Sequence, residues 1–292
     1  MRTTIVPGVK TAVGESPVWD DARGALWMVD ILAPSLLCVA PGGEVMQWTA
    51  PEQIGAVAPS ADGRVAVALA SGFCVFDPEQ GTFGLVTPAR CAAGAVISEG
   101  KADRDGRLVG LSGDSRFRDP LGRLHRWEPD GSVTVFGDGY VLGNGLCWNR
   151  EGSVMYAADS LRGTIFAYDY TAEVPSRPVV FAQPEGPGFP DGATVDADDH
   201  LWVVMHNGGV VLRLDPRGRE VERHALPGPH VTSLAFRGAA AEVFLTSLDH
   251  HAIPGEAAPA LDVGEAAGVL YRAEGIGPGG IAETYARAPA AR

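Results

Sequence analysis

Three short segments of the sequence set an oxygen-bearing side chain beside glycine or proline. They are Gly14-Glu15-Ser16-Pro17, Gly143-Asn144-Gly145 and Pro190-Asp191-Gly192. Taken alone, each of the three polar residues is typical of a turn. Carboxylate and amide oxygens are also the hard ligands that Ca²⁺, Mg²⁺ and Mn²⁺ prefer. If the fold brings the three together, their two carboxylates need a cation to offset their repulsion. The segments therefore predict one divalent metal ion bound by Glu15, Asn144 and Asp191.

An internal repeat supplies a way to bring these segments together. Its pattern is an apolar pair, a polar turn that usually holds Asp and Gly, and an alternating apolar strand. The copies begin at Val18, Val57, Ala102, Leu146, Thr194 and, in a degenerate form, Leu234. A second hairpin follows each copy, and the spacing of roughly 40–48 residues is that of β-propeller blades. We therefore expect an all-β fold, a six-bladed β-propeller with four antiparallel strands per blade, as one domain over residues 1–292.

The register of the repeat places the three candidate ligands at one depth. The copies align on the turn residues Asp20, Pro59, Asp103, Asn149, Asp196 and Phe236. Five residues before these lie Glu15, Ile54, Ser98, Asn144, Asp191 and Val231. Equal steps along equivalent strands reach equal depth, so Glu15, Asn144 and Asp191 should face one point on the axis. The run from Thr3 to Val6 should pair with the last blade, which would close the ring and hide an open strand edge.

Composition limits the kinds of partner. The chain has 23 Lys and Arg against 36 Asp and Glu, a net charge of −13, and shows no basic patch for nucleic acid or an anionic membrane surface. No apolar run approaches the roughly 20 residues of a membrane-spanning helix. The start lacks an apolar signal core, so the cytoplasm is the expected compartment. Cys38, Cys74, Cys91 and Cys147 form no C-x-x-C pair and are expected to be small buried hydrophobes.

The sequence resembles the gluconolactonase family, which includes senescence marker protein (regucalcin) and sugar lactonases. The matching stretches are Gly14-Glu15-Ser16-Pro17-Val18-Trp19, Asn144-Gly145-Leu146-Cys147-Trp148, Tyr156-Ala157-Ala158-Asp159-Ser160, Pro190-Asp191-Gly192-Ala193-Thr194-Val195-Asp196 and Leu201-Trp202-Val203-Val204. The resemblance implies a divalent-metal-dependent hydrolase that opens a lactone ring, with Glu15, Asn144 and Asp191 as ligands. It also implies that Asp191 is the catalytic residue that transfers a proton. Ca²⁺ is the first expected ion, with Zn²⁺, Mg²⁺, Mn²⁺ and Fe²⁺ as alternatives.

One segment departs from the family pattern. Members with sugar-lactone activity commonly have Arg-x-Asn-Asp-Gly-Lys where this chain has Val96-Ile97-Ser98-Glu99-Gly100-Lys101. The substrate-binding arginine is thus Val96 here, and the asparagine is Ser98. We expect the substrate to be a small-molecule lactone of the sugar (aldono) class, either an aldonolactone other than glucono-lactone or a less hydroxylated lactone. The expected substrate-binding residues are Ser98, Glu99, Arg116 and His206.

Two further polar sites are expected to have ordinary structural roles. Asp159 should form hydrogen bonds within its own blade. The pair His250-His251 precedes a stretch rich in Ala, Pro and Gly. We expect an exposed loop there, with a lid over the site as the alternative.

Other functions stay open at this point. One alternative is a phosphotriesterase or aryl-esterase on a similar propeller, and another is a non-catalytic propeller that binds calcium. No G-x-S-x-G elbow is evident, which disfavours a serine nucleophile. The expected assembly is a monomer or a small homo-oligomer.

Overall fold

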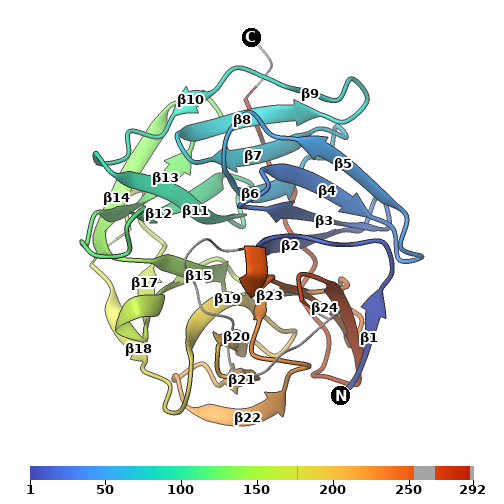
Figure 1. Ribbon diagram of the computed structural model, residues 1–292. Helices are drawn as coiled ribbons and strands as arrows, with labels where there is room; N and C mark the ends of the chain where they lie inside the picture. The colour runs from blue at the N-terminus through green and yellow to red at the C-terminus, as the bar shows by residue number, and fades with distance from the viewer. Residues whose placement is uncertain (176, 253–266, 290–292) are drawn as a thin grey trace.

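The computed structural model describes residues 1–175, 177–252 and 267–289 of the chain. Its strands form six antiparallel sheets arranged in a ring, which confirms the six-bladed propeller (Figure 1). The first three sheets contain β2 (Gly14–Asp20), β3 (Ala25–Asp30), β4 (Ser35–Val39) and β5 (Val45–Thr49); β6 (Ile54–Pro59), β7 (Val65–Leu69), β8 (Gly72–Asp77), β9 (Thr82–Phe83) and β10 (Thr87–Pro88); and β11 (Ala95–Ala102), β12 (Leu108–Asp114), β13 (Gly122–Trp127) and β14 (Val133–Tyr140).

The remaining three sheets complete the ring. They contain β15 (Gly143–Trp148), β16 (Val154–Asp159), β17 (Thr164–Asp169) and β18 (Val179–Ala182); β19 (Phe189–Val195), β20 (Leu201–His206), β21 (Val210–Leu214) and β22 (Glu220–Ala225); and β23 (Val231–Phe236), β24 (Glu242–Ser247), β25 (Leu270–Glu274) and β1 (Arg2–Val6). Two short 3₁₀ turns, η1 (Ser160–Arg162) and η2 (His250–Ala252), are the helical segments of the described ranges. No helix in this part of the chain is long and apolar enough to cross a membrane.

The N-terminal strand closes the ring, as the sequence predicted. β1 pairs antiparallel with β25, from Arg2 opposite Glu274 to Val6 opposite Leu270. The sixth sheet therefore takes one strand from the start of the chain and three from its end (Figure 1). The pairing covers the edge of β25 that would otherwise present unpaired backbone groups.

The aspartates of the repeat explain its hairpin turns. In three blades the turn after the first strand begins with a buried aspartate, Asp20, Asp103 or Asp196, whose carboxylate accepts backbone N–H groups two to four residues later. Trp27 and Trp202, at equivalent positions of the second strand, donate their indole N–H to Asp20 and Asp196. The turn residue thus ties the hairpin to the blade core.

The hydrophobic core lies between the blades. In the described residues the buried apolar side chains form six clusters, and each cluster joins two neighbouring blades. Four of the first strands, β2, β6, β15 and β23, are buried along their whole length because each packs against a blade on either side. Cys38, Cys74 and Cys147 are buried as predicted, whereas Cys91 is half-buried, and all four are free.

The first strand of every blade contains a β-bulge near its start. The pairing with the second strand shifts register at Glu15/Val18, Ile54/Ala56, Ile97/Glu99, Asn144/Cys147, Pro190/Ala193 and Val231/Leu234. The three predicted ligand segments are therefore bulged strands and not irregular turns, because their pairing with the second strand resumes after one extra residue.

Two of the predicted inner positions are wrong by one residue. In the third blade, the backbone N–H of the turn residue Asp103 donates across the turn to the carbonyl oxygen of Arg107. In the last blade, the corresponding N–H belongs to Arg237, which donates to the carbonyl oxygen of Glu242. Arg237 and not Phe236 is therefore the equivalent turn residue. Five residues earlier lies Thr232 and not Val231. The side chain of Val231 is in an interblade core cluster, because a one-residue step turns a side chain to the opposite face of a strand. In the second blade the turn residue is likewise Ser60 and not Pro59. The inner position is therefore Gly55, and the predicted Ile54 lies in a core cluster.

Candidate functional site

A cavity of about 550 Å³ lies at the end of the ring axis where the first strands begin. Glu15, Asn144 and Asp191 all line it. Their exposed fractions are 7, 9 and 6%, so all three are buried at its inner end. The structure therefore brings together the three residues that the repeat register had placed at one depth.

Buried aspartates hold the backbone that leads to two of these residues. Asp30, at the end of β3, accepts hydrogen bonds from the N–H groups two and three residues before Glu15, at 3.0 and 2.7 Å. Asp159, at the equivalent end of β16, accepts from the groups two and three residues before Asn144, at 3.4 and 2.9 Å. The predicted hydrogen bonding of Asp159 within its own blade is thus confirmed. Each anchor sets where the following side chain enters the cavity.

The bulges aim the side chains inward and let the strands approach closely. The residues after Glu15 and Asn144 have positive φ, 47° at Ser16 and 60° at Gly145. Gly145 also lies so close to β19 that a Cβ atom would be 2.9 Å from the carbonyl oxygen of Asp191. A Cβ atom on Gly192 would lie 2.0 Å from the Oγ of Ser233. The glycines beside the candidate ligands are therefore required by strand packing near the axis.

Ser160 determines which atom Asn144 presents to the cavity. The Oγ of Ser160 donates its single proton to the carbonyl oxygen of Pro190 at 2.6 Å. Its 2.9 Å contact with Asn144 must then be accepted from the side-chain NH₂ group. The Oδ1 oxygen of Asn144 is consequently turned away from Ser160. Ser160 is not among the site residues predicted from the sequence, although it follows Asp159 in one of the stretches that match the family.

The acidic groups of the site are close enough to perturb one another. Burial, with the charges of Asp191 and Glu99, raises the pKa of Glu15 well above its ordinary value. Burial and the charge of Glu99 raise the pKa of Asp191. Burial raises the pKa of Glu99 to about 7. The buried carboxylates of Glu15, Glu99 and Asp191 therefore repel one another when they are charged, and a divalent cation would offset that repulsion.

The donor set fits a hard cation. In the described ranges, no three His, Cys, Asp or Glu side chains form a metal-binding group, so a site here depends on the amide oxygen of Asn144. Two carboxylates and one amide oxygen leave further coordination positions for water or substrate, as calcium sites in proteins often do. The residues present are therefore suited to a divalent cation of the Ca²⁺ class.

His206 and Thr232 also line the cavity. Nδ1 of His206 lies 3.0 Å from the carbonyl oxygen of Val231, which can only accept, so Nδ1 carries a proton. The same nitrogen is 3.7 Å from Oδ2 of Asp191. Thr232 donates to the carbonyl oxygen of Gly14 at 2.6 Å and ties the last blade to the first. Thr232 occupies the inner position that the sequence alignment had given to Val231.

The four predicted substrate-binding residues divide into two groups. Ser98 and His206 line the cavity, whereas Glu99 and Arg116 do not. Glu99 is 6% exposed and accepts a hydrogen bond from the N–H of Gly100 at 2.7 Å. Arg116 is exposed, and the next residue, Phe117, lines the cavity in its place.

The predicted exposed loop at His250-His251 is partly wrong. His250 is 7% exposed, and its ring centroid is 6.1 Å from that of His206. His251 is exposed. The rest of this loop, residues 253–266, lies outside the described residues, and the alternative of a lid stays untested.

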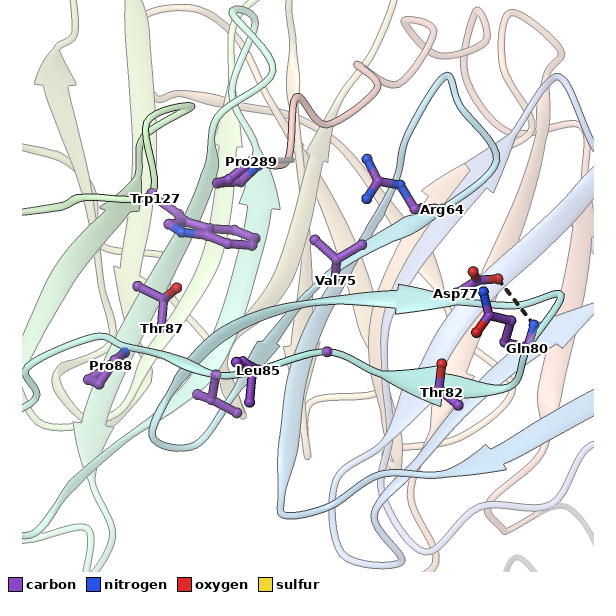
Figure 2. A pocket seen from close by; sticks show the side chains of 13 residues that line it. Arg64, Val75, Asp77, Gln80, Thr82, Leu85, Thr87, Pro88, Trp127 and Pro289 are labelled. Atoms are coloured by element: carbon purple, nitrogen blue, oxygen red, sulfur yellow. Dashed lines mark hydrogen bonds between the residues drawn. The ribbon is translucent and has the colours of Figure 1, made fainter. Parts of the chain in front are cut away.

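A second cavity of about 550 Å³ lies at the outer edge of the second blade. Figure 2 shows Val75, Leu85, Trp127 and Pro289 around it, with Asp77 at the other end. Asp77 accepts the N–H of Gln80 at 3.1 Å, within its own turn. No second acidic side chain lines this cavity in the described part of the chain, so it lacks the paired carboxylates found at the axial cavity.

Residues 13–249 match the model of the SMP-30/gluconolactonase/LRE-like region. The chain belongs to this family. A curated relative, the regucalcin of Danio rerio, is 30% identical over 289 residues, which cover 93% of this chain and 94% of the relative.

Solved structures related to the family share the propeller. One is a calcium-binding protein, regucalcin, from Agrobacterium tumefaciens, with a TM-score of 0.83, 22% identity and coverage of 99% of this chain and 96% of that chain. Another is a gluconolactonase from Xanthomonas campestris, with a TM-score of 0.74, 20% identity and coverage of 93% and 88%. At these identities the likeness establishes the common fold.

Proposed function

We propose that this protein is a divalent-metal-dependent hydrolase that opens a lactone ring in the axial cavity. The observation that carries the proposal is the convergence of Glu15, Asp191 and an oriented Asn144 at the inner end of that cavity. Membership of a family that includes gluconolactonases supports the reaction class. The A. tumefaciens structure is named as a calcium-binding protein, which supports Ca²⁺ as the first ion to test.

In this proposal Glu15, Asn144 and Asp191 hold the cation. A bound divalent cation would act as a Lewis acid that polarises the lactone carbonyl. Asp191 would accept a proton from the attacking water and return it to the ring oxygen as the ring opens. His206, 3.7 Å from Asp191 and held by the backbone of β23, would limit the rotation of that carboxylate.

The test is a lactone-opening assay on chelator-treated protein with metal added back. We expect Ca²⁺, or another of the named divalent ions, to restore ring opening. Mn²⁺-soaked crystals should show an anomalous-difference peak between the three side chains. Asp191→Asn should abolish turnover with the same circular dichroism spectrum as the native protein. Asp77→Asn, a matched change at the second cavity, should retain full turnover.

Each result separates one part of the proposal. Near-normal turnover by Asp191→Asn with metal supplied would show that another group transfers the proton. Metal binding without hydrolysis of any lactone or aryl ester would instead favour a calcium-binding propeller. Hydrolysis that survives complete metal removal would contradict the proposed role of the cation.

A further inference from the structure

The outer rim of the axial cavity is formed by exposed apolar side chains from three different blades. Leu32, Phe117 and Leu161 line it and are 46, 59 and 48% exposed. Leu32 lies between β3 and β4, Phe117 between β12 and β13, and Leu161 in η1. Soluble proteins seldom gather large apolar side chains on an exposed patch unless the patch binds something.

The chain holds Phe117 over the cavity by specific backbone contacts. Phe117 has φ 58°, an unfavourable conformation for an aromatic residue. Its N–H donates to the carbonyl oxygen of Asp114 at 2.9 Å. The Asp114 carboxylate accepts the N–H groups of Arg116, Arg118 and Asp119 at 3.2, 2.9 and 2.9 Å. This set of bonds stabilises the strained loop, so the position of the ring is a feature of the fold.

Apolar surface continues from the rim toward the candidate ligands. Ile31, Val96 and Phe189 also line the cavity and are half-buried. By the sequence resemblance, Val96 stands where members with sugar-lactone activity commonly carry an arginine. A substrate that reaches the carboxylates must therefore pass along apolar side chains on several sides.

The rim has few groups that could bind the hydroxyls of a sugar. Of the described residues that line the cavity, none is Lys or Arg. Both carboxylate oxygens of Asp114 already accept backbone N–H groups of the Phe117 loop. The other polar side chains of the lining are Gln53, Ser115 and Asn207, which are uncharged, and Ser98, His206 and Thr232 beside the candidate ligands. Nδ1 of His206 and the hydroxyl of Thr232 already donate to backbone carbonyl oxygens. A hydroxyl-rich ring would lose hydrogen bonds to water without enough partners to replace them.

We propose that the preferred substrate is a lactone with an alkyl or aryl substituent. Its ring carbonyl lies at Glu15, Asn144 and Asp191, and its substituent packs against Leu32, Phe117 and Leu161. This inference rests on the proposed lactonase function and adds the substrate class.

The experiment compares kcat/KM over a series of γ-lactones from γ-butyrolactone to γ-decalactone, with dihydrocoumarin and glucono-1,5-lactone. We expect kcat/KM to rise about fourfold for each methylene that the rim buries, until the side chain outgrows it. Dihydrocoumarin should exceed glucono-1,5-lactone by at least about tenfold, since burying its aromatic ring should be worth several methylenes.

Variants of the rim give the second measurement. Leu161→Ser and Phe117→Ser should each lower the ratio of kcat/KM for γ-decalactone to that for γ-butyrolactone by about tenfold, the loss expected when one apolar contact is removed. Leu85→Ser is the matched control, since Leu85 is 88% exposed at the second cavity, and it should leave the ratio unchanged. Val96→Arg with Ser98→Asn should raise kcat/KM for glucono-1,5-lactone by about 10- to 100-fold.

The outcomes separate this inference from the function on which it rests. If no lactone is opened with any of the divalent ions, the proposed function fails and the substrate class falls with it. If γ-butyrolactone is opened but kcat/KM does not depend on chain length, the lactonase function stands and the rim inference is overturned. A preference of the native protein for glucono-1,5-lactone would overturn the inference in the same way.

Discussion

Replacing Ser160 by alanine should weaken metal binding by releasing the amide of Asn144. Ser160 links two blades, because its hydroxyl donates to the backbone of Pro190 and accepts from the side chain of Asn144. It is 1% exposed, so water cannot readily take its place. Without it, the Asn144 amide can rotate and present its NH₂ group, which cannot bind a cation.

The magnitude follows from the two hydrogen bonds. A net hydrogen bond is worth about 1 kcal/mol, and a buried carbonyl left without a donor costs about 1–3 kcal/mol. The cost of the Pro190 carbonyl lowers the stability of the fold whether or not metal is bound. The lost hydrogen bond to Asn144 weakens metal binding, because the amide is no longer held with its oxygen toward the cation. We therefore expect a Kd for Ca²⁺ about 10- to 100-fold higher.

The assay is calorimetric titration of Ca²⁺ into chelator-treated protein, with terbium luminescence as a second readout. The rise in Tm that saturating Ca²⁺ produces should be smaller in Ser160→Ala than in the native protein. Ser153→Ala is a matched control, because Ser153 accepts the side-chain NH₂ of Asn149 at 3.1 Å at the other end of β15. It should leave Ca²⁺ affinity unchanged.

The refuting result is equally specific. If Ser160→Ala binds Ca²⁺ as tightly as the native protein while Glu15→Gln does not, then Ser160 does not orient the amide. If both Ser160→Ala and Ser153→Ala weaken binding equally, the effect is a general loss of stability in the fourth blade.

Two further predictions concern stability. Burial lowers the pKa of His125 from 6.5 to about 4, so between these values the unfolded chain binds a proton that the folded chain does not. The contribution of His125 alone should therefore be constant above about pH 6.5 and should lower stability by up to about 3 kcal/mol as the pH drops to 4. The raised pKa values of Glu15, Glu99 and Asp191 act in the opposite direction, but they do so equally in the native protein and in a His125→Gln variant. The difference in unfolding free energy between the native protein and His125→Gln, measured in urea, should therefore change by up to about 3 kcal/mol over this range, and a constant difference would contradict the assignment. Deletion of residues 1–6 should lower stability by a few kcal/mol, at about 1 kcal/mol per lost ladder bond, and should promote self-association by exposing the edge of β25. Calorimetry and light scattering test this, and an unchanged Tm would mean that β1 does not close the ring.

Local patterns in the sequence were sufficient to predict the propeller. Alternating apolar strands and Asp-Gly turns recur at blade spacing, and both features act within one hairpin. The closure by β1 could also be predicted, since a ring of sheets leaves one edge to cover. The common depth of Glu15, Asn144 and Asp191 followed from the same repeat, because each lies five residues before an equivalent turn.

The register of the irregular blades could not be obtained in this way. The turn of the last blade has no Asp-Gly signal, and the alignment slipped by one residue, from Thr232 to Val231. A slip of one residue exchanges the two faces of a strand, so Thr232 was missed and a core valine was placed on the axis. Only the backbone pairing across the hairpin identifies the correct position.

The orientation of the side chains around the site was decided by tertiary structure. Ser160 turns the Asn144 amide through a bond to a different blade. Phe117 replaces Arg116 at the cavity because the Asp114 loop imposes a positive φ on one residue. The sequence by itself thus determined the repeat, the ring and the inner residues of four of the six blades, because these depend on spacing along the chain. Which atoms face the cavity depends on contacts between segments far apart in sequence, and only the folded structure brings those segments together.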